Sequence, residues 1–409
     1  MGNDQKVIKL TQQMVRIDST NPGKGEGGMK ESLLSFAAKL HNDYVSVTTE
    51  EALPGRENVM LSLHGRETSP ELVFICHMDT VPVGGGWGED PFSGDIRDGR
   101  LYGRGSCDMK SGFACALSAF QYAAGLYQEG KVPNRTLKLI GTVDEEGDMA
   151  GVEKAIQSGW VSKDSLVLDM EPTNGEVQAA HKGRVWFEIT VEGAAAHAAT
   201  PWKGADAIAA AAEMISFIRK EFFRLKPHPR MGASTVSFGR IAGGSQPYAV
   251  SDQCTVTVDM RLAPPYTSKD AEEIVKRAVQ SVQTMPDQIV FPESGSPASL
   301  NCMVNEAPKA KIMYRLTGDR PFIETDETSE LYVRLLEACE KVTKEQAKTG
   351  VFPGYTDTAV IAGKLGNRNC MSYGPGNLEL AHKPGESVPV DDILRCESVL
   401  KELVNGLMA

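Results

Sequence analysis

The stretch Glu71–Pro82, ELVFICHMDTVP, is an apolar run that ends in a histidine and an aspartate two residues apart. Residues two apart in a strand point to the same side, so we expect His77 and Asp79 to project together from the strand's carboxyl end. The near-continuous apolar run predicts a strand buried on both faces, as in parallel sheets. Open sheets of that class place their sites at the carboxyl ends of strands. Taken alone, the pair has a structural alternative, a polar cap on a core strand.

Strand-like and helix-like segments alternate around this stretch through the first 180 residues. Short runs rich in branched residues occur at NVMLSLHG, TLKLIGTV and SLVLDME. Apolar residues at helical spacing occur at VIKLTQQMVRI, at MKESLLSFAAKL and roughly over residues 111–127. The alternation predicts an α/β fold with a mostly parallel sheet. The same style returns after about Thr325, in SELYVRLLEACEKV and TAVIAGKL.

The middle of the chain has a different pattern. VWFEITVEG, STVSFGRIAGG, QCTVTVDMRLA and KAKIMYRL are typical of strands, and ADAIAAAAEMISFIRKEF and KDAEEIVKRAVQSV are typical of helices. Their order, βαββαβ, predicts two helices packed on an antiparallel sheet. The sequence therefore predicts an α+β domain at residues 183–319, inserted into an α/β domain formed by residues 1–182 and 320–409.

The composition limits the classes of partner. The 409-residue chain is long enough for two domains and carries a formal net charge of −11. An acidic balance argues against nucleic acid, because a phosphate backbone selects basic surfaces. The sequence contains no 18-residue apolar run and no signal-peptide pattern at its start. Its eight cysteines form no C-x-x-C pair, and several lie in apolar stretches as free cytosolic cysteines do. We therefore expect a cytoplasmic protein with no membrane or nucleic-acid partner.

Further side chains of metal-ligand type follow other apolar segments or lie in glycine-rich loops. They are Asp108, the run Asp144, Glu145 and Glu146, Glu171 with Asp169 as its competitor, and His382. Each has an ordinary alternative, such as a helix cap, a solvated turn or a surface histidine. Together, two histidines and at least three carboxylates at strand ends suit zinc, with one carboxylate bridging two ions about 3.5–4 Å apart. Because neighbouring residues face different ways, one glutamate of the run can bind metal while the next acts as a general base.

Seven segments along the chain carry a resemblance to a known family. They are HMDTVP, GRGSCDMKSG, DEEG, MEPT, GAAAHAA, DMRLAP and GPGNLELAHKPGE. In their order and approximate spacing they resemble the M20 metallopeptidase and deacylase family, over essentially the whole chain. That family includes acetylornithine deacetylase, succinyl-diaminopimelate desuccinylase, glutamate carboxypeptidase and aminoacylase. The resemblance implies a zinc-hydrolase domain with an inserted lid or dimerisation domain.

Carried over residue by residue, the resemblance implies two zinc ions per chain. His77 and Glu171 would hold one ion, Glu146 and His382 the other, and Asp108 would bridge them. Asp79 would orient His77, and Glu145 would be the general base. Cobalt and manganese are expected to substitute for zinc, because N/O sites discriminate weakly between these metals.

The resemblance also implies roles for the inserted domain. His197 would help bind the scissile carbonyl, often across a homodimer interface, and Arg261 would hold a substrate carboxylate. Their alternatives are a buried polar residue and a surface salt bridge. The sequence departs from the family pattern at Tyr248 and Ser251, where the family often has Asn and Pro. This departure concerns carbonyl binding and the substrate, and leaves the metal ligands untouched.

The function expected from these residues is hydrolysis of an amide bond in N-acyl amino acids or short peptides, by a metal-activated water. A dipeptidase or carboxypeptidase is the alternative to a deacylase, because the shape of the acyl pocket decides between them. A non-catalytic binding protein on the same fold is the alternative from another class, and the presence of Glu145 with the full ligand set argues against it. A nucleotide-dependent enzyme is excluded by the lack of G-x-x-x-x-G-K-[ST] and of a strand-linked G-x-G-x-x-G.

Overall fold

The computed structural model describes residues 4–40, 43–128, 132–284 and 309–408, and it divides into two compact units. The large unit consists of Met1–His181 and Ile323–Ala409, and the inserted unit consists of Lys182–Phe322. The sequence-based division was at 183 and 319, so the two divisions differ by one and three residues.

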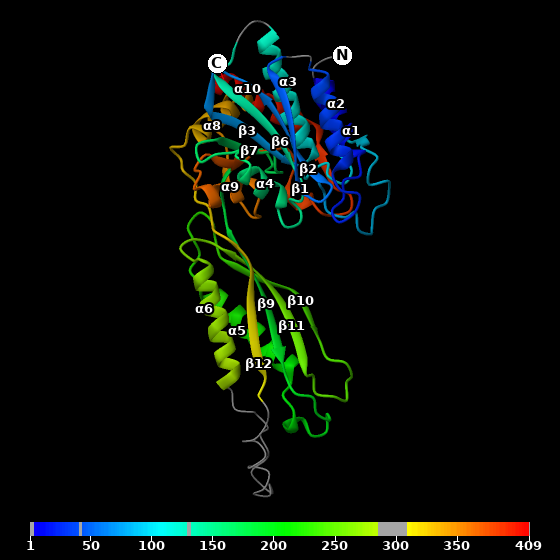
Figure 1. Cartoon of the computed structure of the whole chain (residues 1–409), viewed down its shortest axis with the longest axis vertical. Helices are drawn as coiled ribbons and strands as arrows, with labels where there is room; N and C mark the ends of the chain where they lie inside the picture. Colours follow the sequence, from blue (N-terminus) through cyan, green and yellow to red (C-terminus); the bar gives the residue numbers. More distant parts are fainter. Residues whose placement is uncertain (1–3, 41–42, 129–131, 285–308, 409) are drawn as a thin grey trace, which may run out of the picture. The chain divides into compact units, whose positions relative to one another are not determined.

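The large unit is built on one mixed sheet with a parallel centre (Figure 1). In spatial order its strands are β1 (Val45–Leu53), β2 (Arg56–Leu63), β6 (Arg135–Thr142), β3 (Glu67–His77), β7 (Leu166–Asp169), β14 (Cys370–Ser372), β8 (Val177–His181) and β13 (Thr349–Phe352). The four central strands, β6, β3, β7 and β14, run parallel to one another. Antiparallel pairs join β1 to β2, β2 to β6 and β14 to β8. The predicted α/β class with a mostly parallel sheet is confirmed.

Helices cover both faces of this sheet, which explains the continuous apolar run in β3. One face packs against α1 (Asp4–Val15), α2 (Gly27–Ala38), α3 (Lys110–Gln128), α8 (Glu330–Thr343) and α10 (Val390–Met408), and the other against α4 (Ala150–Gln157) and α9 (Asp357–Leu365). Leu72, Phe74 and Cys76 of β3 belong to the first core, and Val73 and Ile75 belong to the second. Every residue from Glu71 to His77 is therefore buried, and the strand is exposed only at its start, over residues 67–69.

The register of the central strands gathers their carboxyl ends at one edge of the sheet. His77 lies opposite Thr142, the last residue of β6. Asp169, the last residue of β7, lies opposite Ile75 on one side and Ser372 on the other. The segments that follow β3, β6 and β7 therefore leave the sheet side by side, where an α/β fold places its ligands.

A small sheet ties two segments that are far apart in sequence. Strands β4 (Ile96–Arg97), β5 (Arg100–Tyr102) and β15 (Ser387–Pro389) pair antiparallel, with Ser387 opposite Tyr102. This pairing holds the glycine-rich segment before Asp108 beside the chain that follows His382.

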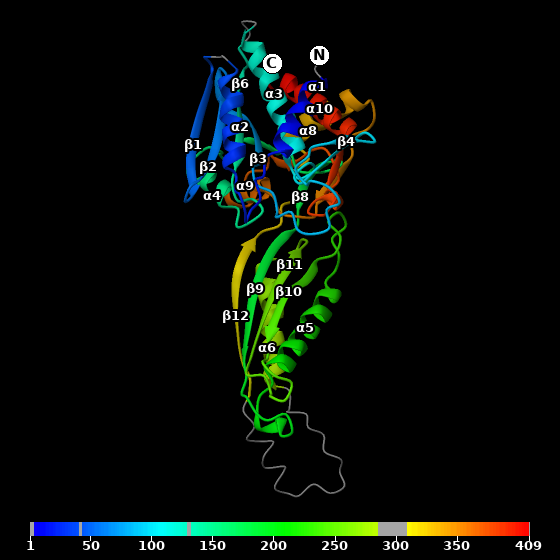
Figure 2. The same cartoon turned by 90° about the vertical axis from the view of Figure 1, so that its right-hand side faces the viewer.

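The inserted unit has the predicted order βαββαβ. Its elements are β9 (Gly183–Glu192), α5 (Ala207–Arg224), β10 (Thr235–Gly243), β11 (Gln253–Leu262), α6 (Ser268–Thr284) and β12 (Lys311–Arg320). The strands form an antiparallel sheet in the order β10-β11-β9-β12, with both helices packed on one face (Figure 2). Residues of β9 and β11 alternate between this buried face and the opposite, half-exposed face. Alternation with period two is what the sequence showed in this region.

The seven cysteines that the structure describes are free and buried, and Cys302 lies outside the described residues. Among the helices of the described segments, none combines the length and apolar character needed to cross a membrane. The cytoplasmic location stays a prediction.

One buried histidine makes the stability of the large unit depend on pH. His181, at the end of β8, is 1% exposed, and its ring centroid lies 5.7 Å from that of Phe352 and 6.3 Å from that of Tyr355. Burial lowers the pKa of His181 from 6.5 to about 4. Between these values the unfolded chain binds a proton that the folded chain does not.

The neutral, buried His181 therefore contributes its full stabilisation above pH 6.5, and this contribution is lost as the pH falls toward 4. From pH 7.5 to pH 5 we expect the wild type to lose about 2 kcal/mol more unfolding free energy than His181→Phe, measured by urea denaturation. The exposed His64 supplies the control, and His64→Phe should keep the pH slope of the wild type. Equal slopes for the wild type and His181→Phe would contradict this account of His181.

Candidate metal centre

Five side chains of the large unit converge at the carboxyl edge of its sheet. They are His77 at the end of β3, Asp108 before α3, Glu146 after β6, Glu171 after β7 and His382 after the short helix η2 (Leu378–Leu380). The glycine-rich segment before Asp108 needs a tight backbone path. Gly105 has a φ of +80°, and a Cβ there would lie 2.8 Å from Cγ2 of Thr80. Only glycine fits such a turn without strain.

The five residues form two groups that share Asp108. In the first group, His77 Nε2 lies 3.0 Å from Asp108 Oδ1 and 3.8 Å from Glu171 Oε1. In the second, His382 Nε2 lies 3.1 Å from Glu146 Oε1 and 3.3 Å from Asp108 Oδ2. One carboxylate thus turns one oxygen toward each histidine, which is the arrangement of a bridging ligand.

The chemistry of these groups fits a pair of divalent cations. Within each group the ligand atoms lie within 4.8 Å of one another, and imidazole with carboxylate is a donor set that zinc accepts. Burial and the nearby Asp108 raise the pKa of Glu171 well above its usual range, although His77 acts in the opposite direction. Burial would also raise the pKa of Asp108, but hydrogen bonds from His382 and His77 outweigh it and hold this pKa below its usual value. Cations at these positions would compensate the concentrated negative charge.

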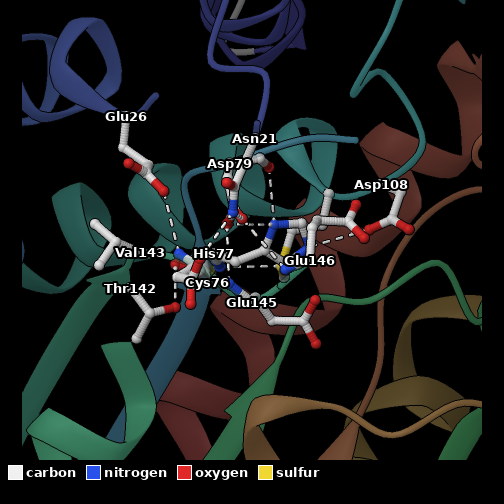
Figure 3. Close-up of polar contacts among 12 residues, drawn as sticks. Asn21, Glu26, Cys76, His77, Asp79, Asp108, Thr142, Val143, Glu145 and Glu146 are labelled. Atoms are coloured by element: carbon white, nitrogen blue, oxygen red, sulfur yellow. Dashed lines mark hydrogen bonds and ion pairs between the residues drawn. The ribbon is translucent and has the colours of Figure 1, made fainter. Parts of the chain in front are cut away.

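Asp79 supports the site differently from the expectation that its carboxylate orients His77. The backbone carbonyl of Asp79 accepts a hydrogen bond from His77 Nδ1 at 2.9 Å, whereas its carboxylate Oδ1 lies 3.7 Å from that nitrogen. The carboxylate instead accepts hydrogen bonds from the backbone N–H groups of Glu145 and Glu146, both at 3.2 Å (Figure 3). Asp79 therefore fixes the tautomer of His77 through its main chain and the glutamate turn through its side chain.

The two glutamates of this turn differ in their surroundings. Glu146 belongs to the second ligand group and Glu145 belongs to neither. Their side chains leave the turn in different directions (Figure 3). Burial raises the pKa of Glu145 well above its usual range, with His77 opposing this and the carboxylates of Asp357, Glu146 and Asp108 adding to it. Glu145 therefore lies beside the candidate ligands without belonging to either group, which is the position that the general-base expectation requires.

Asp169, the alternative to Glu171 as a ligand, makes a structural contact between β7 and α9 instead. It is buried at the end of β7 and accepts a hydrogen bond from Thr358 Oγ1 at 2.7 Å. It belongs to neither ligand group. Strand β7 ends at Asp169, so Glu171 lies beyond the strand, and of the two residues only Glu171 belongs to the first group.

A polar network that the sequence did not reveal holds the glutamate turn in place. Asn21 Nδ2 donates to Asp79 Oδ2 at 2.9 Å and to Asp144 Oδ1 at 3.0 Å. Asp144 also pairs with Arg56 at 3.1 Å, and its backbone N–H donates to Glu26 at 3.1 Å. These residues come from the loop before α2 and from β2, and no local sequence signal connects them to the turn.

The remaining predicted residues lie in the inserted unit. His197 is exposed, and it pairs through its backbone with the segment that contains Tyr248, in a bridge to Ala249. Tyr248 is 63% exposed, whereas Ser251 is buried and donates to Gln253 O at 2.8 Å. Arg261 is held by Asp259 through Nε at 2.7 Å and Nη2 at 2.9 Å. The departure from the family pattern therefore lies beside His197.

Comparisons with known proteins identify the family and the fold of the chain. The sequence model of Peptidase family M20/M25/M40 matches residues 73–406. An uncharacterized metallohydrolase of Methanocaldococcus jannaschii is 26% identical over 429 aligned residues, covering 98% of this chain and 99% of that protein. Acetylornithine deacetylase of Myxococcus xanthus is 28% identical over 341 residues, covering 81% of this chain and 79% of that protein. Among solved structures, aminopeptidase PepT of Bacillus cereus shares the fold, with a TM-score of 0.73 at 19% identity over 99% of both chains.

Asn21 gives a direct test of the network around the glutamate turn. Asn21→Asp replaces a shared donor with a third carboxylate between Asp79 and Asp144. We expect it to lower the unfolding free energy by about 1–3 kcal/mol, measured by urea denaturation in a metal chelator. Asn405→Asp is the matched control, because Asn405 Oδ1 accepts from the Tyr122 hydroxyl and a carboxylate can still do so. Equal losses for the two variants would contradict the role given to Asn21.

Proposed function

The chain belongs to peptidase family M20/M25/M40 and is a metallohydrolase, and on this premise we propose that it hydrolyses an amide bond of N-acyl amino acids or short peptides with two zinc ions. The observation that carries the proposal is Asp108, whose two carboxylate oxygens face one histidine each, in two ligand groups. Two cations that share one carboxylate are typical of sites that activate water for hydrolysis.

The chain's own residues divide the chemistry among them. A cation pair held there would supply a polarised water and positive charge near the carbonyl oxygen. Glu145, outside both ligand groups, takes a proton from the attacking water and delivers it to the leaving amine nitrogen. Attack forms the new C–O bond and a tetrahedral carbon, and the amide C–N bond then breaks as the nitrogen leaves with the proton from Glu145. The remaining proton of the product acid passes to the amine, giving a carboxylate and an ammonium group.

Two residues of the inserted unit are proposed to bind the substrate. The backbone N–H of Ala199 donates to Nδ1 of His197 at 3.1 Å, so the neutral ring carries its proton on Nε2. Nε2 can then donate to the substrate carbonyl oxygen as negative charge develops there. Asp259 orients the guanidinium of Arg261 through Nε and Nη2, and Nη1 has further donors for a substrate carboxylate.

The choice between deacylase and peptidase is a choice of acyl group. The relative from Myxococcus xanthus favours a deacylase, and the fold shared with the Bacillus cereus aminopeptidase favours a peptidase. We propose the deacylase first, because the deacetylase is 28% identical to this chain in sequence, whereas the likeness to the aminopeptidase is one of fold at 19% identity. Assays with N-acetyl and N-succinyl amino acids and with dipeptides distinguish the two activities. A chain that binds metal but hydrolyses none of these substrates would support the alternative of a non-catalytic binding protein.

The two adjacent glutamates should separate catalysis from metal binding. We expect Glu145→Gln to keep the metal and to lower turnover by about 10²–10⁴-fold, because a general base is lost. We expect Glu146→Gln to weaken binding of the ion shared with His382. Elemental analysis and steady-state rates on both variants are the measurements. Loss of metal in Glu145→Gln, with metal and rate intact in Glu146→Gln, would reverse the two roles.

We further propose a homodimer formed through residues 183–319, in which His197 of one subunit completes the site of the other. Support comes from β10, which lies at the edge of its sheet and is largely exposed. Two such edges can pair in an antiparallel dimer and satisfy their free backbone groups.

Mixing two inactive variants tests this assembly. His197→Ala and Glu145→Ala homodimers should each be nearly inactive. A mixed dimer has one site that combines an intact Glu145 with an intact His197 from the other subunit, so subunit exchange should restore activity at up to about half of the mixed dimers' sites. Verified exchange without recovered activity would show that His197 acts within its own subunit, and a monomer in light scattering would exclude the dimer.

A further inference from the structure

We propose that Glu386 is a positioning residue of the metal centre, which fixes the backbone at the shared ligand Asp108 and joins it to the loop that carries His382. The inference rests on the proposed function, because it assigns Glu386 a role in holding the cation pair. Glu386 belongs to neither ligand group, and it is not the proposed general base, which is Glu145.

The Glu386 carboxylate binds the chain directly at Asp108. Its Oε1 accepts hydrogen bonds from the backbone N–H of Cys107 at 2.9 Å and of Asp108 at 3.1 Å. Glu386 is 1% exposed, so these bonds are shielded from water. Two backbone donors on one buried oxygen fix the peptide planes from which the Asp108 side chain departs.

Arg104 holds the other oxygen of this carboxylate. Its Nη1 donates to Glu386 Oε2, and its Nη2 donates to the carbonyl of Val83 at 3.2 Å. The guanidinium lies over the ring of Trp87, 5.4 Å from the ring centroid, and Arg104 is itself 1% exposed. The ion pair therefore joins the C-terminal segment to the glycine-rich segment and to the chain that follows Asp79.

The main chain of Glu386 makes the same connection. Its carbonyl accepts from the N–H of Gly103 at 3.0 Å, next to the rung in which Ser387 of β15 faces Tyr102 of β5. His382 lies only four residues earlier, and Cys107 Sγ donates to the carbonyl of Asn377 at 3.3 Å on the other side of it. The loop with His382 is thus attached at both ends to the segment that carries Asp108.

The chemistry of the contacts requires a carboxylate. A glutamine could accept the two backbone N–H groups with its oxygen, but its NH₂ group would then face the Nη1 donor of Arg104. A second buried negative charge so near Asp108 is unfavourable by itself, and Arg104 offsets it. Glu386 is therefore more than one half of a stabilising ion pair, because its hydrogen bonds fix the backbone from which the shared ligand Asp108 projects.

Cobalt titration of the full chain tests the inference. Co²⁺ reports both affinity and ligand geometry through its visible absorption. We expect Glu386→Gln to weaken cobalt binding at both sites by about 10–100-fold, the usual effect of losing a group that orients metal ligands, and to change the absorption of the bound ion. Arg104→Lys keeps the charge but cannot bind Glu386 and the carbonyl of Val83 in the same way. It should change binding in the same direction by a smaller factor, and it stands in if Glu386→Gln does not fold.

Glu71→Gln is the matched control. Glu71 is also buried, accepts from Lys138 at 3.0 Å and from Ser165 at 2.9 Å, and lies six residues before His77 in β3. It should lose stability without changing cobalt affinity or absorption. If Glu386→Gln or Arg104→Lys titrates like the wild type, Glu386 is a structural ion pair and the inference is overturned, while the proposed function stands. A wild-type chain that binds no cobalt would overturn both.

Discussion

The carboxylate of Asp108, placed between two imidazoles, is the interaction around which the candidate metal centre is arranged. Oδ1 faces His77 at 3.0 Å and Oδ2 faces His382 at 3.3 Å. Glu146 and Glu171 complete the two groups around it. Burying this much negative charge is unfavourable unless cations or protons compensate it. This concentration of charge is the reason for our proposal that the two groups hold a pair of cations.

The fold supplies that separation by rigid means. Strands β3, β6 and β7 end together because their register is fixed by cores on both faces of the sheet. His77, the glutamate turn and Glu171 leave from these ends, and the Asp79 carboxylate ties the first two segments together. The other two candidate ligands, Asp108 and His382, lie in loops. A ligand in a loop needs additional contacts to be held as firmly as a ligand at a strand end. Glu386 and the β5–β15 pair give that support.

Parts of this arrangement could be predicted from the sequence because they depend on local patterns. The β3 run, the βαββαβ order and the polar residues that follow apolar strands are such patterns. Strand β1 was missed because it is largely exposed and has no apolar run, and β8 because its sequence, VQAAH, has no run of branched residues. Asn21 and Glu386 act through contacts 58 and 278 residues away in sequence, which no local pattern encodes. The hydrogen bond of His77 to the carbonyl of Asp79, rather than to its carboxylate, depends on backbone angles that the residue types do not specify.

Anomalous X-ray diffraction at the zinc absorption edge, on crystals grown with zinc, tests the shared carboxylate most directly. The account predicts two peaks about 3.5–4 Å apart. One peak should be bound by His77 and Glu171, the other by Glu146 and His382, with one oxygen of Asp108 on each. A single peak, or two peaks with Asp108 bound to only one of them, would contradict the account.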